Sequence, residues 1–109
     1  MTQLLASDVK TVGSNGRAVC QVQPLRAFEW WHITMTTVQS TSSVLIPTLR
    51  LYRGGESPSS LIDGTFRGTL NSTADPIDLQ NGERLLAVFE GADVGSQCTL
   101  AVTGDLKGR

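Results

Sequence analysis

Apolar and polar residues alternate with a period of two along much of this chain, which is typical of β-strands that face a core on one side. A strand is predicted at 17–23, after the turn signal Asn15–Gly16. Its apolar side would carry Ala18, Cys20 and Val22. No window longer than about 10 residues keeps the 3.6-residue apolar spacing of an amphipathic helix.

The segment 28–34, with the sequence FEWWHIT, contains both tryptophans and the single histidine of the chain. Neighbouring residues of a strand point to opposite faces, so Trp30 and Trp31 cannot both enter the core of a two-layer sandwich. Ile33 and Met35 are apolar in step with Trp31, which places Trp31 in the predicted core. Trp30 would then point outward, on the side of His32, Thr34 and Thr36.

Further strands are predicted at 43–53, 84–91 and 98–106. In the first, Leu49 and Leu51 alternate with polar residues, and Pro47 is compatible only with an edge, a bulge or a strand start. The other two look like a hairpin closed by the sequence GADVGS, in which Gly91 and Gly95 would supply positive φ angles.

Segments rich in Gly, Ser, Asn, Asp and Pro separate these strands and predict loops, with one short strand at 64–70. The count of six to eight short strands favours an all-β fold, an antiparallel β-sandwich of jelly-roll or immunoglobulin-like type. The 109 residues suit one domain. Residues 1–27 would be an N-terminal arm or the first strands, and 28–109 the body of the sandwich.

Charge and apolar content exclude several classes of function. The nine Lys and Arg residues are scattered and the formal net charge is −1, so no nucleic-acid partner is expected. No apolar stretch approaches the roughly 20 residues of a membrane-spanning helix, and no membrane partner is expected. The start of the chain has no basic leader followed by a long apolar run, which favours synthesis in a cytoplasm.

A catalytic constellation is not visible, so no enzyme activity, catalytic residue or cofactor is expected. One histidine and two distant thiols cannot complete a zinc site. Asp75 and Asp78 leave calcium as a minor alternative to a simple turn before Pro76. Cys20 and Cys98 are expected to be buried free thiols, with a bridge between two strands as the alternative.

An outward Trp30 favours an interface, because an exposed indole leaves roughly 150–250 Å² of mostly apolar surface in water. Its partner could be a second copy of the chain, another protein or a sugar ring. The alternative is that a loop of the same chain covers the ring, or that it stays exposed. The predicted interface residues are Trp30, His32, Tyr52 and Arg53.

The sequences LRLYRGGESPSSLIDGTFRGTLNST and PIDLQNGERLLAVFEGADVGSQCTLAVTGDL, preceded by the WWHIT strand, carry a resemblance to a known family. Residues 28–106 resemble the small β-sandwich virion proteins of tailed bacteriophages of actinobacteria. The resemblance implies a non-enzymatic virion protein, most plausibly a capsid decoration or minor capsid protein, and brings no catalytic residues. It fades over the first 27 residues.

The predicted partners are therefore other virion proteins, such as the major capsid protein or tail proteins, together with further copies of the chain. The predicted location is the virion, after synthesis in the host cytoplasm. The alternatives are a tail or neck component, and a β-sandwich module that binds carbohydrate or a host surface through Trp30 and Tyr52.

Overall fold

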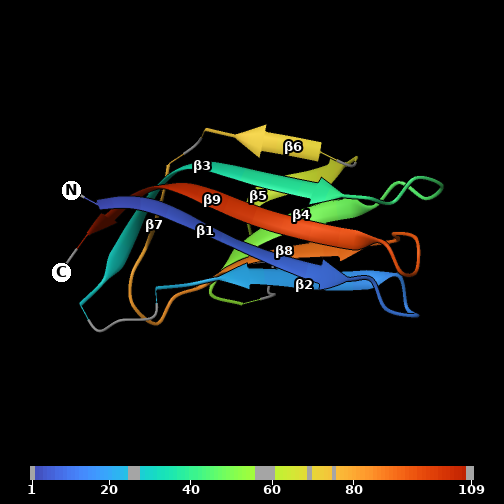
Figure 1. Cartoon of the computed structure of the whole chain (residues 1–109), viewed down its shortest axis with the longest axis horizontal. Helices are drawn as coiled ribbons and strands as arrows, with labels where there is room; N and C mark the ends of the chain where they lie inside the picture. Colours follow the sequence, from blue (N-terminus) through green and yellow to red (C-terminus); the bar gives the residue numbers. More distant parts are fainter. Residues whose placement is uncertain (1, 25–27, 56–60, 69, 75, 108–109) are drawn as a thin grey trace.

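The computed structural model describes residues 2–24, 28–55, 61–68, 70–74 and 76–107, with the backbone alone described at 2, 63–67, 71 and 73. This part of the chain forms two antiparallel sheets packed face to face, so the predicted all-β sandwich is confirmed (Figure 1). Sheet A contains β1 (Thr2–Thr11), β9 (Gln97–Lys107), β3 (Trp30–Ser40), β6 (Leu70–Thr73) and β7 (Ile77–Leu79). Sheet B contains β2 (Arg17–Val22), β8 (Leu85–Glu90), β4 (Thr48–Arg53) and β5 (Leu61–Arg67).

The strand order is nested. Sheet A runs β1-β9-β3-β6 and sheet B runs β2-β8-β4-β5, so the first strand pairs with the last and the second with the next to last. β6 and β7 occupy the same place in the strand order, because both pair with the same edge of β3. β7 pairs with residues 31–33 and β6 with residues 36–39. This order is that of a jelly roll, in which one long hairpin is rolled across two sheets. The first 27 residues contribute β1 to one sheet and β2 to the other.

The core lies between the sheets and is built from the inward residues that the period of two indicates. In β2 the residues Ala18, Cys20 and Val22 are buried, as the alternation predicted. In β4 the buried residues are Leu49 and Leu51, and Pro47 lies directly before the strand start. The largest apolar side chains at the centre are Phe89, Ile33, Leu79, Leu85 and Leu100.

The predicted hairpin of 84–91 with 98–106 is wrong, because β8 and β9 lie in different sheets. The connection between them does contain the expected left-handed glycines, with φ of 75° at Gly91 and 84° at Gly95. Its backbone bonds to the β1–β2 loop: Ala92 N–H donates to the Gly16 carbonyl, and Gly95 N–H to the Val12 carbonyl. The two connections therefore lie side by side at this end and cross between the sheets in opposite directions.

The expectation that Met35 joins Trp31 and Ile33 in the core is also wrong, since 44% of Met35 is exposed. The pairing of β3 with β9 shifts by one residue between Ile33 and Met35, which is a β-bulge at Thr34. Beyond it the buried positions are Thr36, Val38 and Ser40. The extra residue reverses the facing of the second half of the strand.

Candidate functional site

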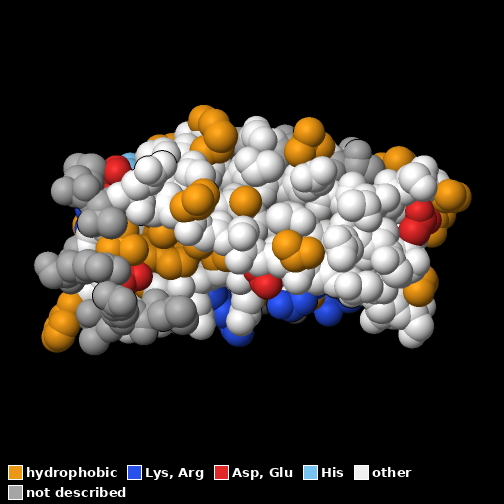
Figure 2. All heavy atoms as spheres, in the orientation of Figure 1, with side chains coloured by type: hydrophobic (Ala, Val, Ile, Leu, Met, Phe, Trp, Pro, Cys, Tyr) orange, Lys and Arg blue, Asp and Glu red, His pale blue; other side chains and the backbone are white. Residues whose placement is uncertain are grey.

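The outer face of sheet A has no charged side chain over its centre among the described residues. Over this centre the three long strands present uncharged polar residues with isolated exposed apolar side chains, and the charged Asp105 and Lys107 lie toward the end of β9. In Figure 2, which shows this side, the orange side chains over the middle of the face stand apart from one another, and a continuous orange area lies toward the left end. We call this surface the sheet A face; its central residues are Leu5, Ser7, Val9, Met35, Thr37, Gln39, Leu70, Ser72, Thr99, Ala101 and Thr103.

Trp30 and His32 lie at one end of this face, where the sequence predicted an outward side. Trp30 is partly buried, and Nζ of Lys107 lies 5.4 Å from the centre of its ring, a cation–π contact. Lys107 is the cross-strand partner of Trp30 in β9. A neighbouring strand thus covers part of the outer indole, and the rest of the ring faces outward.

His32 is bonded within the same sheet. Its Nδ1 lies 2.6 Å from Oδ1 of Asp78, the residue opposite it in β7. Nη1 of Arg53 donates to the backbone carbonyl of Asp78 at 3.3 Å. Two of the predicted interface residues, His32 and Arg53, therefore meet at Asp78. The sequence had assigned Asp78 to a turn or a calcium loop.

Tyr52 lies elsewhere, on the outer face of sheet B, and does not join Trp30 in one patch. Its cross-strand neighbour in β8 is Leu86, which is buried although it points away from the core. Charged and polar pairs surround it: Nη1 of Arg84 lies 3.4 Å from Oε1 of Gln21, and Arg50 lies 3.7 Å from Glu90. The two outer faces differ, because sheet B carries these charges and sheet A has none at its centre.

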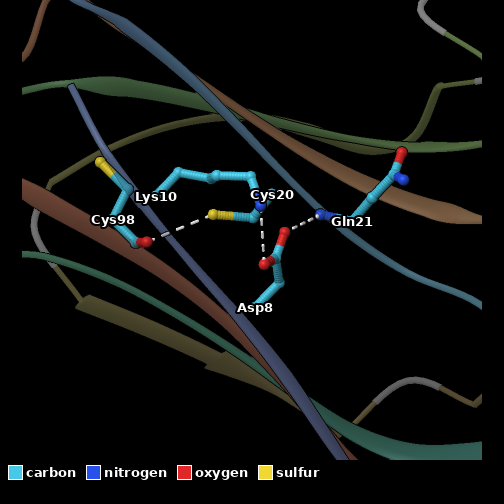
Figure 3. Close-up of polar contacts among 5 residues, drawn as sticks. All are labelled: Asp8, Lys10, Cys20, Gln21 and Cys98. Carbon is cyan, nitrogen blue, oxygen red and sulfur yellow. Dashed lines mark hydrogen bonds and ion pairs between the residues drawn. The ribbon is translucent and has the colours of Figure 1, made fainter. Parts of the chain in front are cut away.

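Both cysteines lie near a second region of interest, the seam between β1 and β2 (Figure 3). Asp8 accepts hydrogen bonds from the backbone N–H of Gln21 and from Nζ of Lys10, both at 2.9 Å. Burial acts to raise the pKa of Asp8, but these hydrogen bonds and the charge of Lys10 outweigh it and hold the pKa below its usual value. The Asp8 carboxylate therefore links β1 and β2, two edge strands of different sheets that do not pair with each other.

Cys20 and Cys98 are free and buried, as expected. Sγ of Cys20 donates to the carbonyl oxygen of Cys98 at 3.2 Å. Burial and, next, the charge of Asp8 raise the pKa of the Cys20 thiol to about 12. Burial also raises the pKa of Cys98. Both sulfurs are held as neutral thiols, which are poor nucleophiles and poor metal ligands.

We expect native protein at pH 8 to incorporate no iodoacetamide within the time in which denatured protein labels two thiols. The raised pKa of Cys20 and the burial of both sulfurs keep the thiolate fraction and access low. Mass spectrometry before and after denaturation measures the labelling. Rapid modification of either cysteine in the native state would contradict the geometry.

The seam also contains a groove of about 330 Å³. We call it the Trp31 groove; it is lined by Ala6, Ser7, Gln21, Val22, Gln23 and Trp31. Trp31 is otherwise buried, and its Nε1–H donates to the buried carboxylate of Glu29 at 3.0 Å. No charged side chain is part of the lining that the described residues form.

Within the described residues, no three His, Cys, Asp or Glu side chains come together as a metal site, and the Asp75 of the calcium alternative lies outside this part. No helix in the described ranges is long and apolar enough to cross a membrane. Comparison with protein-family models and with curated proteins finds no match to this chain.

Proposed function

We propose that this chain is a non-enzymatic structural protein of a bacteriophage virion, of the capsid decoration or minor capsid type. It binds the assembled particle through the sheet A face, with Trp30 and His32 at the end of the contact. The observation that supports this proposal most directly is the difference in charge between the outer faces of the two sheets. The sheet A face has no charged side chain at its centre, whereas sheet B carries Arg50, Arg84 and Glu90.

The size of this face suits a stable contact. Strands of ten or eleven residues and four strand positions give a surface of about 34 Å by 19 Å, or roughly 650 Å², by the usual spacings. Standard interfaces bury roughly 800 Å² on each partner. Their centres are depleted in charged residues and contain apolar anchors, as this face does.

Fold and resemblance support the same role. Jelly rolls occur in viral capsid domains and also in lectins and cupins, so the strand order is compatible with a virion protein without selecting one. The resemblance of residues 28–106 to actinobacteriophage virion proteins is the reason for preferring the virion role. Because Lys107 covers part of Trp30, less of that ring is open for a stacked sugar.

The test is binding of the purified protein to capsids assembled from the coat proteins of the phage that encodes it. We expect Val9→Asp and Met35→Asp each to weaken cosedimentation with the capsids at least tenfold. Both side chains are exposed on the sheet A face, and a buried unpaired carboxylate opposes docking.

The matched control is Ile62→Asp, which places the same charge on an exposed residue of β5, in the other sheet. It should bind as the unmodified protein does. Equal binding by all three variants would contradict docking through the sheet A face. Binding to tails alone would move the protein to the tail or neck, and glycan binding lost in Trp30→Ala would favour the carbohydrate module.

A further inference from the structure

The loop between β3 and β4 presents three consecutive apolar side chains to solvent. Val44 is 82% exposed, Leu45 52% and Ile46 41%, and Val94 of the adjacent β8–β9 connection is 67% exposed. We call these four residues the apolar tip. It lies at the end of the long axis opposite to the chain termini (Figure 1). Isolated exposed hydrophobes are ordinary, but a run of three on one loop leaves an apolar protrusion uncovered.

Asp93 holds this loop in one conformation. Its carboxylate accepts three backbone hydrogen bonds, from Ser43 and Val44 at 2.9 Å and from Leu45 at 3.0 Å. These bonds lower the pKa of Asp93, those from Val44 and Ser43 most strongly. Ser42 adds a second tie, because its hydroxyl accepts from Asp93 N–H and donates to the Leu45 carbonyl.

The tip is therefore ordered before any partner arrives. Ordering a loop on binding costs affinity, and a loop already fixed by its own hydrogen bonds avoids that cost. Residues 41–47 and 92–96 contain one charged residue, Asp93, and its oxygens are already engaged. A tip without Lys or Arg has no attraction for anionic lipid, so its chemistry favours an uncharged apolar pocket of a protein.

The Trp31 groove is such a pocket, and it lies at the other end of the molecule. Among the described residues its lining has no charge and combines Ala6, Val22 and Trp31 with polar Ser7, Gln21 and Gln23. Its volume of about 330 Å³ is at the lower end of ligand pockets. Trp31 is at the start of β3 and the tip follows the end of that 11-residue strand, so no copy can reach its own groove.

We propose that the apolar tip of one copy docks into the Trp31 groove of a second copy. The contact joins opposite ends of a molecule 43 Å long, so it is head-to-tail and generates rings or open rows. It does not depend on particle binding, because it shares only Ser7 with the central residues of the sheet A face and needs no other protein.

A few side chains bury much less than the roughly 800 Å² per partner of a standard interface, so the free protein should associate weakly. Copies held side by side on a particle would meet at a high effective concentration, at which a weak contact forms rows. The contact adds a second binding surface to the proposed virion protein. It does not require that the proposed function is correct.

Concentration-dependent ¹⁵N–¹H NMR tests the contact on the whole chain. Between roughly 50 μM and 1 mM, a range chosen for a weak contact, we expect shifts at amides 44–46 and at the Trp31 indole N–H. Trp30→Phe assigns the two indole signals. Leu45→Asp should abolish the shifts, and Leu70→Asp, which adds the same charge to an exposed residue of β6, should keep them.

Mixing two variants then tests the head-to-tail geometry. Labelled Leu45→Asp keeps an intact groove, and unlabelled Gln23→Arg keeps an intact tip beside an obstructed groove. Adding the second to the first should shift the Trp31 indole signal and give a mass no greater than a dimer in sedimentation. Adding unlabelled Leu45→Asp should shift nothing.

Three results would overturn the inference. The first is an absence of concentration-dependent shifts up to about 1 mM in the unmodified protein. The second is association that survives in both Leu45→Asp and Val94→Asp. The third is Leu45-dependent binding to phosphatidylcholine–phosphatidylglycerol vesicles without self-association. Each leaves the capsid-binding test unchanged, so the two proposals can fail separately.

Discussion

Replacing Gly104 with alanine is expected to lower the free energy of unfolding by about 3 kcal/mol or more, a large fraction of the stability of a small domain. Gly104 of β9 pairs with Ile33 of β3, directly beside the bulge at Thr34. A Cβ at this position would overlap the carbonyl oxygen of His32 and lie 2.9 Å from Cα of Ile33 and N of Thr34. These are backbone atoms of a central strand, which cannot move as a side chain would.

Urea denaturation followed by fluorescence measures the loss. The control is Gly55→Ala, since a Cβ at Gly55 would have no neighbour within 4 Å. That variant should change the free energy of unfolding by less than about 1 kcal/mol. Equal stability of the two variants would contradict the close approach of Gly104 to His32. The requirement is steric, and it fixes the position at which β3 reverses its facing.

The alternation of residues predicted the layers correctly wherever the ladder is regular. The patterns around Cys20 in β2 and around Leu51 in β4 identified the inward residues without any structure. These predictions succeed because a period of two follows from the backbone itself and needs no knowledge of which strand lies next door.

Predictions that needed the neighbouring strand were wrong. Nothing within 30–36 marks Thr34 as a bulge; the signal is Gly104, 70 residues away, and only the pairing of β3 with β9 joins them. The hairpin prediction joined β8 to β9 because they are adjacent in sequence, whereas hydrogen bonds to the β1–β2 loop direct the connection across the sandwich.

The candidate site was predicted in part. The chain pattern placed Trp30 and His32 on an outward side, but it could not show that Asp78 bonds to His32 or that Arg53 reaches the same residue. The segment 43–47 was included in a strand because Val44, Leu45 and Ile46 are β-branched or apolar. Asp93, about 50 residues later, accepts the backbone N–H groups of Ser43, Val44 and Leu45 and holds the segment in a loop.

Replacing Trp31 with alanine should cost about 3–5 kcal/mol of unfolding free energy, whereas the same change at Trp30 should cost less than about 1 kcal/mol. Trp31 is buried in the core, and its indole N–H donates to the buried Glu29 carboxylate. Trp30→Ala loses a partly covered ring and its contact with Lys107. The two residues differ by one position and are otherwise chemically identical.

Urea denaturation of the pair measures the difference in stability, and capsid binding measures the difference in function. Trp30→Ala should remain folded and lose affinity for the particle, because its ring lies at the end of the sheet A face. Trp31→Phe, which keeps an aromatic ring without the donor to Glu29, should fall between Trp31→Ala and the unmodified protein in stability. Equal costs for the two alanine variants would mean that both rings are core residues, and the outward indole would no longer support a docking face. If the two alanine variants lose different amounts of unfolding free energy but Trp30→Ala binds the particle normally, the two rings do face opposite sides of β3. Trp30 is then not part of the contact with the particle.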